Sequence, residues 1–147
     1  MTAANAKAAF GIELWMVPDG ETLAKLTELV TLTPPPVTRG TIDATTHDSA
    51  GGAMEKIASG VYEVGAISGQ VHYVPGSTAD IAFRTAMTGG ALQDFKIVFP
   101  VGSPKKNLTG SGFLTQYEPQ DAPVDGKLVA NITITPTGAV TAGAEAA

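Results

Sequence analysis

The sequence predicts a mainly β protein with one α-helix and a long inter-strand loop. Short apolar stretches alternate with turns rich in glycine, proline and threonine, as in all-β domains. The longest stretches alternate apolar and polar residues with a period of two. Only one segment carries a clear helix start. With 147 residues the chain suits one hydrophobic core, so we expect a single domain over 1–147.

The first strand is expected at Phe10 to Val17, "FGIELWMV", because the turn residues Pro18-Asp19-Gly20 follow it. Residues 1–9 ahead of it are expected to be a flexible N-terminus. The next segment, "ETLAKLTELVTL", is ambiguous, because its leucine spacing suits a helix while "LVTLT" suits a strand. The prolines Pro34 to Pro36 end whichever element precedes them.

A strand with an alternating polar face, "VTRGTIDAT", follows these prolines. The polar, glycine-rich segment from about His47 to Gly60 comes next and is longer than an ordinary hairpin loop. The segment "VYEVGAISGQVHYVP" is then expected to be one long strand that is buried on one face. In that strand the apolar residues Ile67, Val71 and Tyr73 alternate with Ser68, Gln70 and His72.

The single predicted helix begins at Ser77, because Asp80 three residues later completes a capping box. Its apolar side is expected to hold Ile81, Phe83 and Met87, and Gly89-Gly90 ends it.

Three strands close the predicted domain: "FKIVF", "LTGSGFLTQY" and "KLVANITIT". Gly110-Ser111-Gly112 lies inside the second of them, which indicates close packing of backbones rather than a phosphate loop. In the last strand, one face is expected to be apolar and the other polar: Leu128, Ala130, Ile132 and Ile134 lie opposite Asn131, Thr133 and Thr135. The residues from about 139 to 147 are expected to be a flexible tail.

The composition excludes several classes of function. The net charge is −5, and the only basic cluster is Lys105-Lys106, which argues against gripping a nucleic-acid backbone. The absence of cysteine removes disulfide and thiolate chemistry. We find no export signal, no apolar run long enough for a membrane helix, and no motif for a cofactor. Only 16% of the residues are charged, which suggests that partners cover part of the surface.

His47, Asp48 and Ser49 have the residue types of a hydrolase site. Neighbouring residues on an extended chain point in different directions, so turn chemistry explains them better than catalysis. A metal site made from His47, His72 and Asp43 lacks a recognised ligand spacing. We therefore expect no catalytic residues, no metal and no cofactor.

A polar sheet face, a long arm between two strands and few charges together favour a protein that associates with copies of itself. The stretch "TPPPVTRGTIDATTHDSAGGAMEKIASGVYEVGAISGQVHYVPGS" is followed by a short helix and by "DFKIVFP", "GSGFLTQYEP" and "GKLVANITITPTG". This order of segments resembles the major tail tube protein of long-tailed, non-contractile bacteriophages and related gene transfer agents. The resemblance runs from about Leu14 to Gly138.

The resemblance implies an antiparallel β-sandwich with one flanking α-helix, and a structural subunit without enzymatic activity. It implies hexameric rings stacked into a hollow tube, through which DNA passes without specific binding. The expected partners are further copies of the chain, a tape-measure protein, a tail terminator and tail-tip proteins, with no membrane insertion. The expected location is the virion tail, and the host cytoplasm before assembly.

The resemblance also favours a strand from about Leu26 to Thr33. It makes the segment at about 47–60 an assembly loop that reaches a neighbouring subunit, with the following candidate residues: His47, Asp48, Ser49, Gly51, Gly52, Met54, Glu55, Lys56 and Ile57.

A tube wall that DNA slides past should be neutral or acidic, because lysine and arginine bind phosphate. The candidate lumen residues come from the polar strand faces: Thr41, Asp43, Ser68, Gln70, Asn131, Thr133 and Thr135. Arg39, His72 and Lys127 share those faces, so they either lie outside the bore or pair with acids such as Asp43 or Glu63.

Two other classes of function stay open at this stage. One is a monomeric ligand-binding β-sandwich such as a carbohydrate-binding module, which the scarcity of aromatic residues disfavours. The other is a small hydrolase that uses His47 and Ser49.

Overall fold

The computed structural model describes residues 10–16, 24–25, 29–102 and 104–144. The described elements are β1 (Glu13–Met16), β2 (Ala24–Lys25), β3 (Leu29–Thr33), β4 (Val37–Asp43), a 3₁₀ turn (Ala50–Gly52), β5 (Lys56–Val64), β6 (Ile67–His72), α1 (Thr78–Gly89), β7 (Gln93–Phe99), β8 (Lys106–Pro119) and β9 (Val129–Ala144). This confirms the mainly β class with one α-helix. The flexible N-terminus at 1–9, the Pro18-Asp19-Gly20 turn and the strand start at 26–28 lie outside the described residues.

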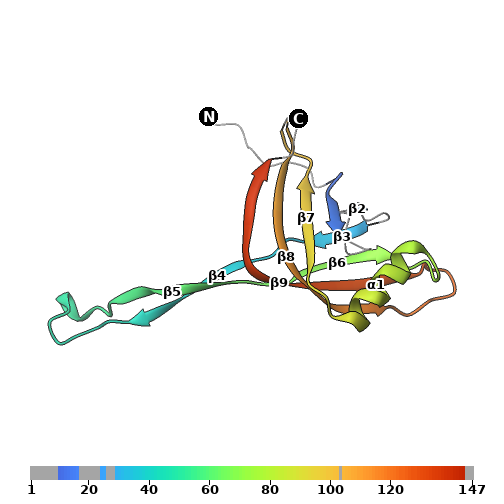
Figure 1. The fold of residues 1–147 in the computed structure, drawn as a ribbon. Helices are drawn as coiled ribbons and strands as arrows, with labels where there is room; N and C mark the ends of the chain where they lie inside the picture. The colour runs from blue at the N-terminus through green and yellow to red at the C-terminus, as the bar shows by residue number, and fades with distance from the viewer. Residues whose placement is uncertain (1–9, 17–23, 26–28, 103, 145–147) are drawn as a thin grey trace.

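Seven strands form one antiparallel sheet in the order β2-β1-β7-β8-β9-β6-β3, and β4 pairs only with β5. The long strands β8 and β9 belong to both halves of this sheet. Lys106–Ser111 of β8 and Thr137–Ala144 of β9 pair with each other beside β7. The remaining residues of the two strands pair with each other beside β6. Figure 1 shows both strands bending between the halves. The two layers of the predicted sandwich therefore come from a single sheet that curls over itself.

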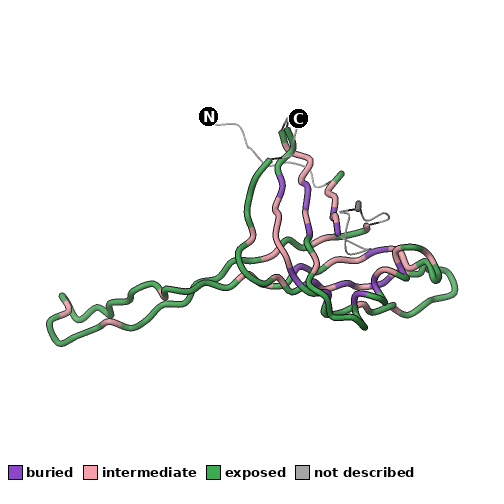
Figure 2. The backbone as a smooth tube through the Cα atoms, in the orientation of Figure 1, coloured by how far each residue is buried: buried purple, intermediate pink, exposed green. Residues whose placement is uncertain are grey.

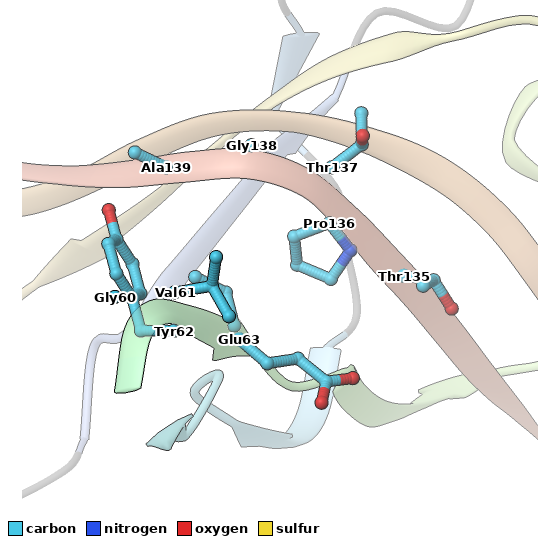
Figure 3. A pocket seen from close by; sticks show the side chains of 10 residues that line it. Gly60, Val61, Tyr62, Glu63, Thr135, Pro136, Thr137, Gly138 and Ala139 are labelled. Carbon is cyan, nitrogen blue, oxygen red and sulfur yellow. The ribbon is translucent and has the colours of Figure 1, made fainter. Parts of the chain in front are cut away.

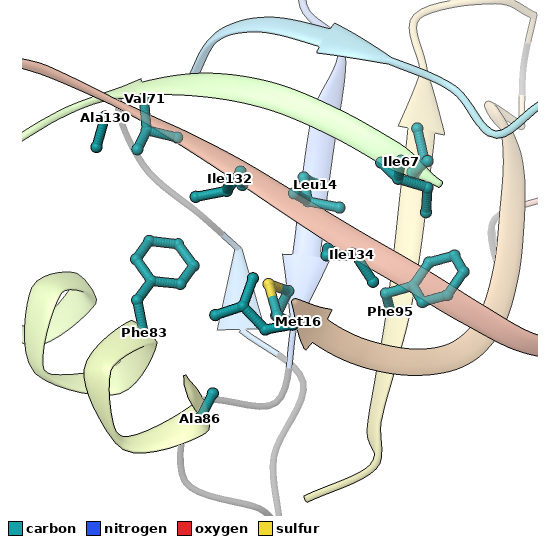
Figure 4. Packing of buried hydrophobic residues seen from close by; sticks show 12 residues of the cluster. Leu14, Met16, Ile67, Val71, Phe83, Ala86, Phe95, Ala130, Ile132 and Ile134 are labelled. Atoms are coloured by element: carbon teal, nitrogen blue, oxygen red, sulfur yellow. The ribbon is translucent and has the colours of Figure 1, made fainter. Parts of the chain in front are cut away.

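The hydrophobic core lies inside this curl. Leu14 of β1 and Phe95 of β7 pack in one cluster with Ile67 of β6 and with Ile132 and Ile134 of β9 (Figure 4). Because successive side chains of a strand point to opposite faces, β1 and the first part of β9 bury every second residue, whereas β7 also buries Val98 next to Ile97. The predicted alternation in β6 and β9 is confirmed.

The bend of the sheet depends on close backbone contact at Gly112. A Cβ atom at this position would lie 2.6 Å from the Thr135 carbonyl oxygen, which no side chain tolerates. The β8–β9 register also shifts on both sides of it, between Thr109 and Ser111 and between Leu114 and Gln116. The expectation of close backbone packing is confirmed at Gly112, whereas a Cβ at Gly110 would meet the side chains of Phe95 and Val140. Irregular pairing of this kind sharpens the local bend of a sheet.

Helix α1 has the predicted ends. The Ser77 hydroxyl accepts a hydrogen bond from the Asp80 backbone N–H at 3.2 Å, and Gly90 ends the helix with a φ of 64°. Phe83 is buried and its ring lies 5.0 Å from that of Tyr117 on β8. The prediction for the other apolar residues was wrong: Ile81 is 58% exposed and Met87 38% exposed.

The buried stripe of α1 instead follows the helical spacing i, i+4, i+7 from Ala79 through Phe83 to Ala86. Ile81 and Met87 lie off this stripe. They were predicted to be buried because they are apolar, but the helical spacing decides which side chains of α1 face the sheet.

A buried carboxylate holds α1 against the sheet. Asp80 accepts hydrogen bonds from the Gly76 backbone N–H, from Arg84 at 3.1 Å and from the Tyr117 hydroxyl at 2.8 Å. The bond from Gly76 is the main cause that lowers the pKa of Asp80, against an opposing effect of burial. Burial and the bond to Asp80 raise the pKa of Tyr117.

Several predicted boundaries were wrong. The strand expected from Phe10 begins at Glu13, and the strand expected from Lys127 begins at Val129 and leaves Leu128 42% exposed. The single strand expected from Val61 to Pro75 is divided into β5 and β6 at Gly65, where the backbone N–H bonds to the Pro36 carbonyl at 2.7 Å. The tail expected at about 139–147 is strand as far as Ala144, because the first half of β8 pairs with it from Lys106 to Thr109. In the part of the chain that the structure describes, no helix is long and apolar enough to cross a membrane.

Candidate functional site

A two-stranded arm projects from the curled sheet. It consists of β4, a tip at residues 44–55, and β5 (Figure 1). The strands pair from Val37↔Val64 at the base to Asp43↔Lys56 near the tip. The predicted assembly loop was therefore too long, because Lys56–Gly60 belongs to a strand. Nearly the whole arm is exposed (Figure 2), as expected for a two-stranded ribbon without a layer against it.

The arm tip is built by side chains that bond to nearby backbone groups. The Ser49 hydroxyl accepts a hydrogen bond from the Thr46 backbone N–H at 3.0 Å, and Asp43 accepts one from Thr45 at 2.9 Å. Hydrogen bonds from Thr45 lower the pKa of Asp43. Gly51 and Gly52 have φ values of 66° and 71°, which favour glycine. This is the turn chemistry expected for the segment that contains His47, Asp48 and Ser49.

The two faces of the arm differ in character. Ile42 and Ile57 are direct cross-strand partners, so their side chains share a face, and they are 52% and 55% exposed. The other face carries the Asp43↔Lys56 pair and Arg39, whose guanidinium lies 5.4 Å from the centre of the Tyr62 ring.

Arg39 also donates a hydrogen bond to the Ser59 carbonyl oxygen at 2.8 Å. Of the two expected alternatives, a place outside the bore or pairing with an acid, the first fits its position on the arm, away from the polar rows of the sheet described below.

A groove separates the arm base from the bend of β9. Its volume is about 490 Å³, and it is lined by Gly60–Val64 on one side and Thr135–Ala139 on the other. Figure 3 shows Val61 and Tyr62 beneath the bend at Pro136. Val61 is 75% exposed, so this groove presents an apolar side chain at the base of the arm.

A second exposed feature is a polar sheet face opposite the core. It is formed by two straight rows of side chains across β8, β9, β6 and β3, set by the strand register. The rows are Glu118–Asn131–Gln70–Thr31 and Gln116–Thr133–Ser68–Thr33, and these eight residues are called the polar face. Only Glu118 among them is charged, and none is lysine or arginine.

Side-chain hydrogen bonds connect the polar face laterally. The Gln116 amide donates to the Glu118 carboxylate at 2.7 Å and accepts from the Thr133 hydroxyl at 3.0 Å. The Gln70 amide donates to the Asn131 side-chain oxygen at 3.4 Å. Beside the face, the hydroxyls of Thr115 and Thr135 lie 3.0 Å apart.

The structure brings together five of the seven residues predicted for a lumen wall. Ser68, Gln70, Asn131 and Thr133 belong to the polar face, and Thr135 adjoins it. Thr41 and Asp43 lie on the arm instead, paired with Ala58 and Lys56.

Sequence reasoning missed four members of the polar face: Thr31, Thr33, Gln116 and Glu118. The alternation in "LVTLT" and "TQYEP" contains the signal, but the pairing of these strands with β6 and β9 is needed to place it.

Of the basic residues expected near this face, His72 adjoins it on β6. His72 ends β6 opposite Val129, and its Nε2 atom is buried without a hydrogen-bond partner among the described residues. Lys127 is exposed in the segment before β9. In the described residues, no three histidine, aspartate or glutamate side chains converge as metal ligands would.

Comparison with known proteins identifies the family. Residues 15–143 match the sequence profile of the lambda phage tail tube protein. The chain belongs to the lambda phage tail tube protein family. It is therefore a structural subunit of a phage-type tail tube, located in the virion tail. No curated protein sequence matches it.

Solved structures show the same fold at low identity. The tail of an empty gene transfer agent particle, refined with C6 symmetry, matches with a TM-score of 0.77 and 18% identity over 95% of this chain and 100% of that chain. The SPP1 tail tube matches with a TM-score of 0.65 and 14% identity over 91% and 77%. The sheath–tube complex of PVC, an extracellular contractile injection system in its extended state, matches with a TM-score of 0.68 and 15% identity over 96% and 93%.

Proposed function

We propose that this tail tube protein assembles into hexameric rings that stack into a tube, with the polar face lining the bore and the arm gripping a second copy. The observation that carries the proposal is the polar face itself. Eight polar side chains form two rows across four strands, on the side of the sheet opposite the core, without a lysine or arginine. Such a wall lacks the cationic side chains that bind the phosphates of duplex DNA.

The arm supports the contact between copies. An isolated two-stranded ribbon is marginally stable in water, and this ribbon also exposes the Ile42–Ile57 pair. Burial of that pair against another copy would supply the packing that the arm lacks in the free subunit. The C6 symmetry of the gene transfer agent tail supports sixfold rings. A tape-measure protein, a tail terminator and tail-tip proteins complete the proposed set of partners.

Arm truncation tests this proposal. Thr41 and Ala58 are cross-strand partners, so residues 42–57 are replaced by an Asn-Gly turn that joins them. We expect a folded protein with unchanged core signals in its NMR spectrum and no tubes in negative-stain electron microscopy.

Asp125→Ala, in the exposed segment before β9, is the control and should assemble like the wild type. Tubes formed by the truncated protein would refute the arm assignment. Loss of its core signals would show that the arm belongs to the folding unit.

A further inference from the structure

We infer that Glu118 is a positioning residue that holds the Gln116 side-chain amide along the sheet, and that this keeps the polar face from binding the phosphates of duplex DNA. The inference rests on the proposed function, because it assigns to one residue pair the non-adhesive property that a DNA conduit needs. A carboxylate on this face can act in two ways: it can repel phosphate, or it can hold a hydrogen-bond donor that would otherwise turn toward phosphate.

The geometry favours the second way. Gln116 and Glu118 are two residues apart on β8 and point to the same face. The amide nitrogen of Gln116 lies 2.7 Å from the Glu118 carboxylate, a distance typical of a hydrogen bond to a charged acceptor. The amide oxygen of Gln116 accepts from Thr133 on β9 at 3.0 Å. Both ends of this amide are therefore held by neighbours on the face.

The same lateral arrangement recurs across the polar face. Gln70 donates to Asn131 on the adjacent strand, so the second glutamine of the face is also engaged along the sheet. Thr115 and Thr135 pair their hydroxyls beside it.

These contacts determine how the face meets DNA. Phosphate oxygens accept hydrogen bonds from glutamine and asparagine side chains as well as from cations. To turn both of its N–H donors toward a phosphate, Gln116 must give up its bond to a carboxylate, which is stronger than a bond to a neutral acceptor. Identical copies around a ring multiply any weak contact, because linked binding sites gain avidity. A small gain in affinity at one site would therefore retain DNA in the tube.

Repulsion by charge alone is a weaker account. Glu118 is the one charged residue of the eight, and screening limits its field to about 8 Å at physiological ionic strength. Repulsion also leaves the Gln116 amide free to rotate toward a phosphate, whereas the hydrogen bonds to Glu118 and Thr133 hold it along the sheet.

A double-mutant comparison on the free subunit distinguishes the two accounts. The four proteins are the wild type, Glu118→Ala, Gln116→Ala and the double variant. Each is titrated with a short DNA duplex at low ionic strength while NMR follows the side-chain amides. We expect Glu118→Ala to bind DNA about tenfold more tightly, with the Gln116 amide shifting on titration. The double variant should return to the wild-type affinity, because the released donor is gone.

Two outcomes would overturn the inference that Glu118 acts through Gln116. Equal binding by Glu118→Ala and the double variant would show that only charge matters and would overturn it. Unchanged binding by Glu118→Ala would overturn it as well. Asp125→Ala changes the net charge by the same amount in an exposed segment away from the rows, and it should bind DNA no more tightly than the wild type.

Failure of the bore assignment has a separate signature. The natural chain has no cysteine, so Ser68→Cys introduces a single thiol on the polar face. A maleimide attached to a bulky polymer should label this thiol in the free subunit and not in assembled tubes. Equal labelling in both states would remove the polar face from the bore while leaving the result on Gln116 intact.

Discussion

The apolar pair on the arm gives a quantitative prediction for assembly. Ile42 and Ile57 keep 52% and 55% of their surface exposed in the subunit. Full burial of an isoleucine side chain contributes about 1.5–3 kcal/mol, so covering the remaining half contributes about 1 kcal/mol for each residue. The double variant Ile42→Ser/Ile57→Ser should therefore lose about 2 kcal/mol per contact between copies. This corresponds to an increase of about 30-fold in the protein concentration at which tubes appear.

Sedimentation velocity over a concentration series, with electron microscopy of each sample, measures this threshold. The free energy of unfolding of the free subunit should change little, because both side chains are already half exposed. Val124→Ser removes an equally apolar side chain from a fully exposed position outside the arm and serves as the control. If tubes of the double variant appear at the same protein concentration as tubes of the wild type, another copy does not cover this face of the arm.

Three further predictions concern the subunit itself. Phe83→Ala should lower the free energy of unfolding by about 4 kcal/mol in chemical denaturation, whereas Ile81→Ala should change it by less than about 1 kcal/mol, because only Phe83 is buried. Gly112→Ala should strongly lower the melting temperature or prevent folding, since its Cβ would meet the Thr135 carbonyl. Gly60→Ala should have a much smaller effect in the same thermal melting experiment, because its Cβ would meet no atom within 4 Å. The folded state lowers the pKa of Asp80. The contribution of Asp80 to the free energy of unfolding is therefore present above the ordinary pKa of 3.8 and is lost as the pH falls through the lowered pKa. This part of the acid dependence should disappear in Asp80→Asn, which denaturation at a series of pH values would show.

Local signals in the sequence predicted the elements whose partners lie nearby or whose pattern is self-contained. The caps of α1 at Ser77 and Gly90 depend only on residues within one helical turn, so they could be predicted. The alternation in β6 and β9 reports burial on one face directly, which is why most of the candidate lumen residues lie together on the polar face.

The features that depend on distant pairing could not be predicted in this way. The extension of β9 to Ala144 requires the first half of β8 as its partner, and nothing within residues 139–144 indicates that strand. Thr41 and Asp43 have the same alternating pattern as Ser68 and Gln70. Their place on a separate ribbon follows only from the break at Gly65, where the chain passes from the arm into the sheet.

A cryo-electron microscopy map of tubes assembled from the wild-type protein would show whether the polar face lines the bore of a sixfold tube. We expect six subunits per ring, with the polar face toward the bore and the arm lying on a second copy. The two rows of the polar face are Glu118–Asn131–Gln70–Thr31 and Gln116–Thr133–Ser68–Thr33. A map with those rows on the outer surface, or with a bore lined by lysine and arginine, would contradict this expectation.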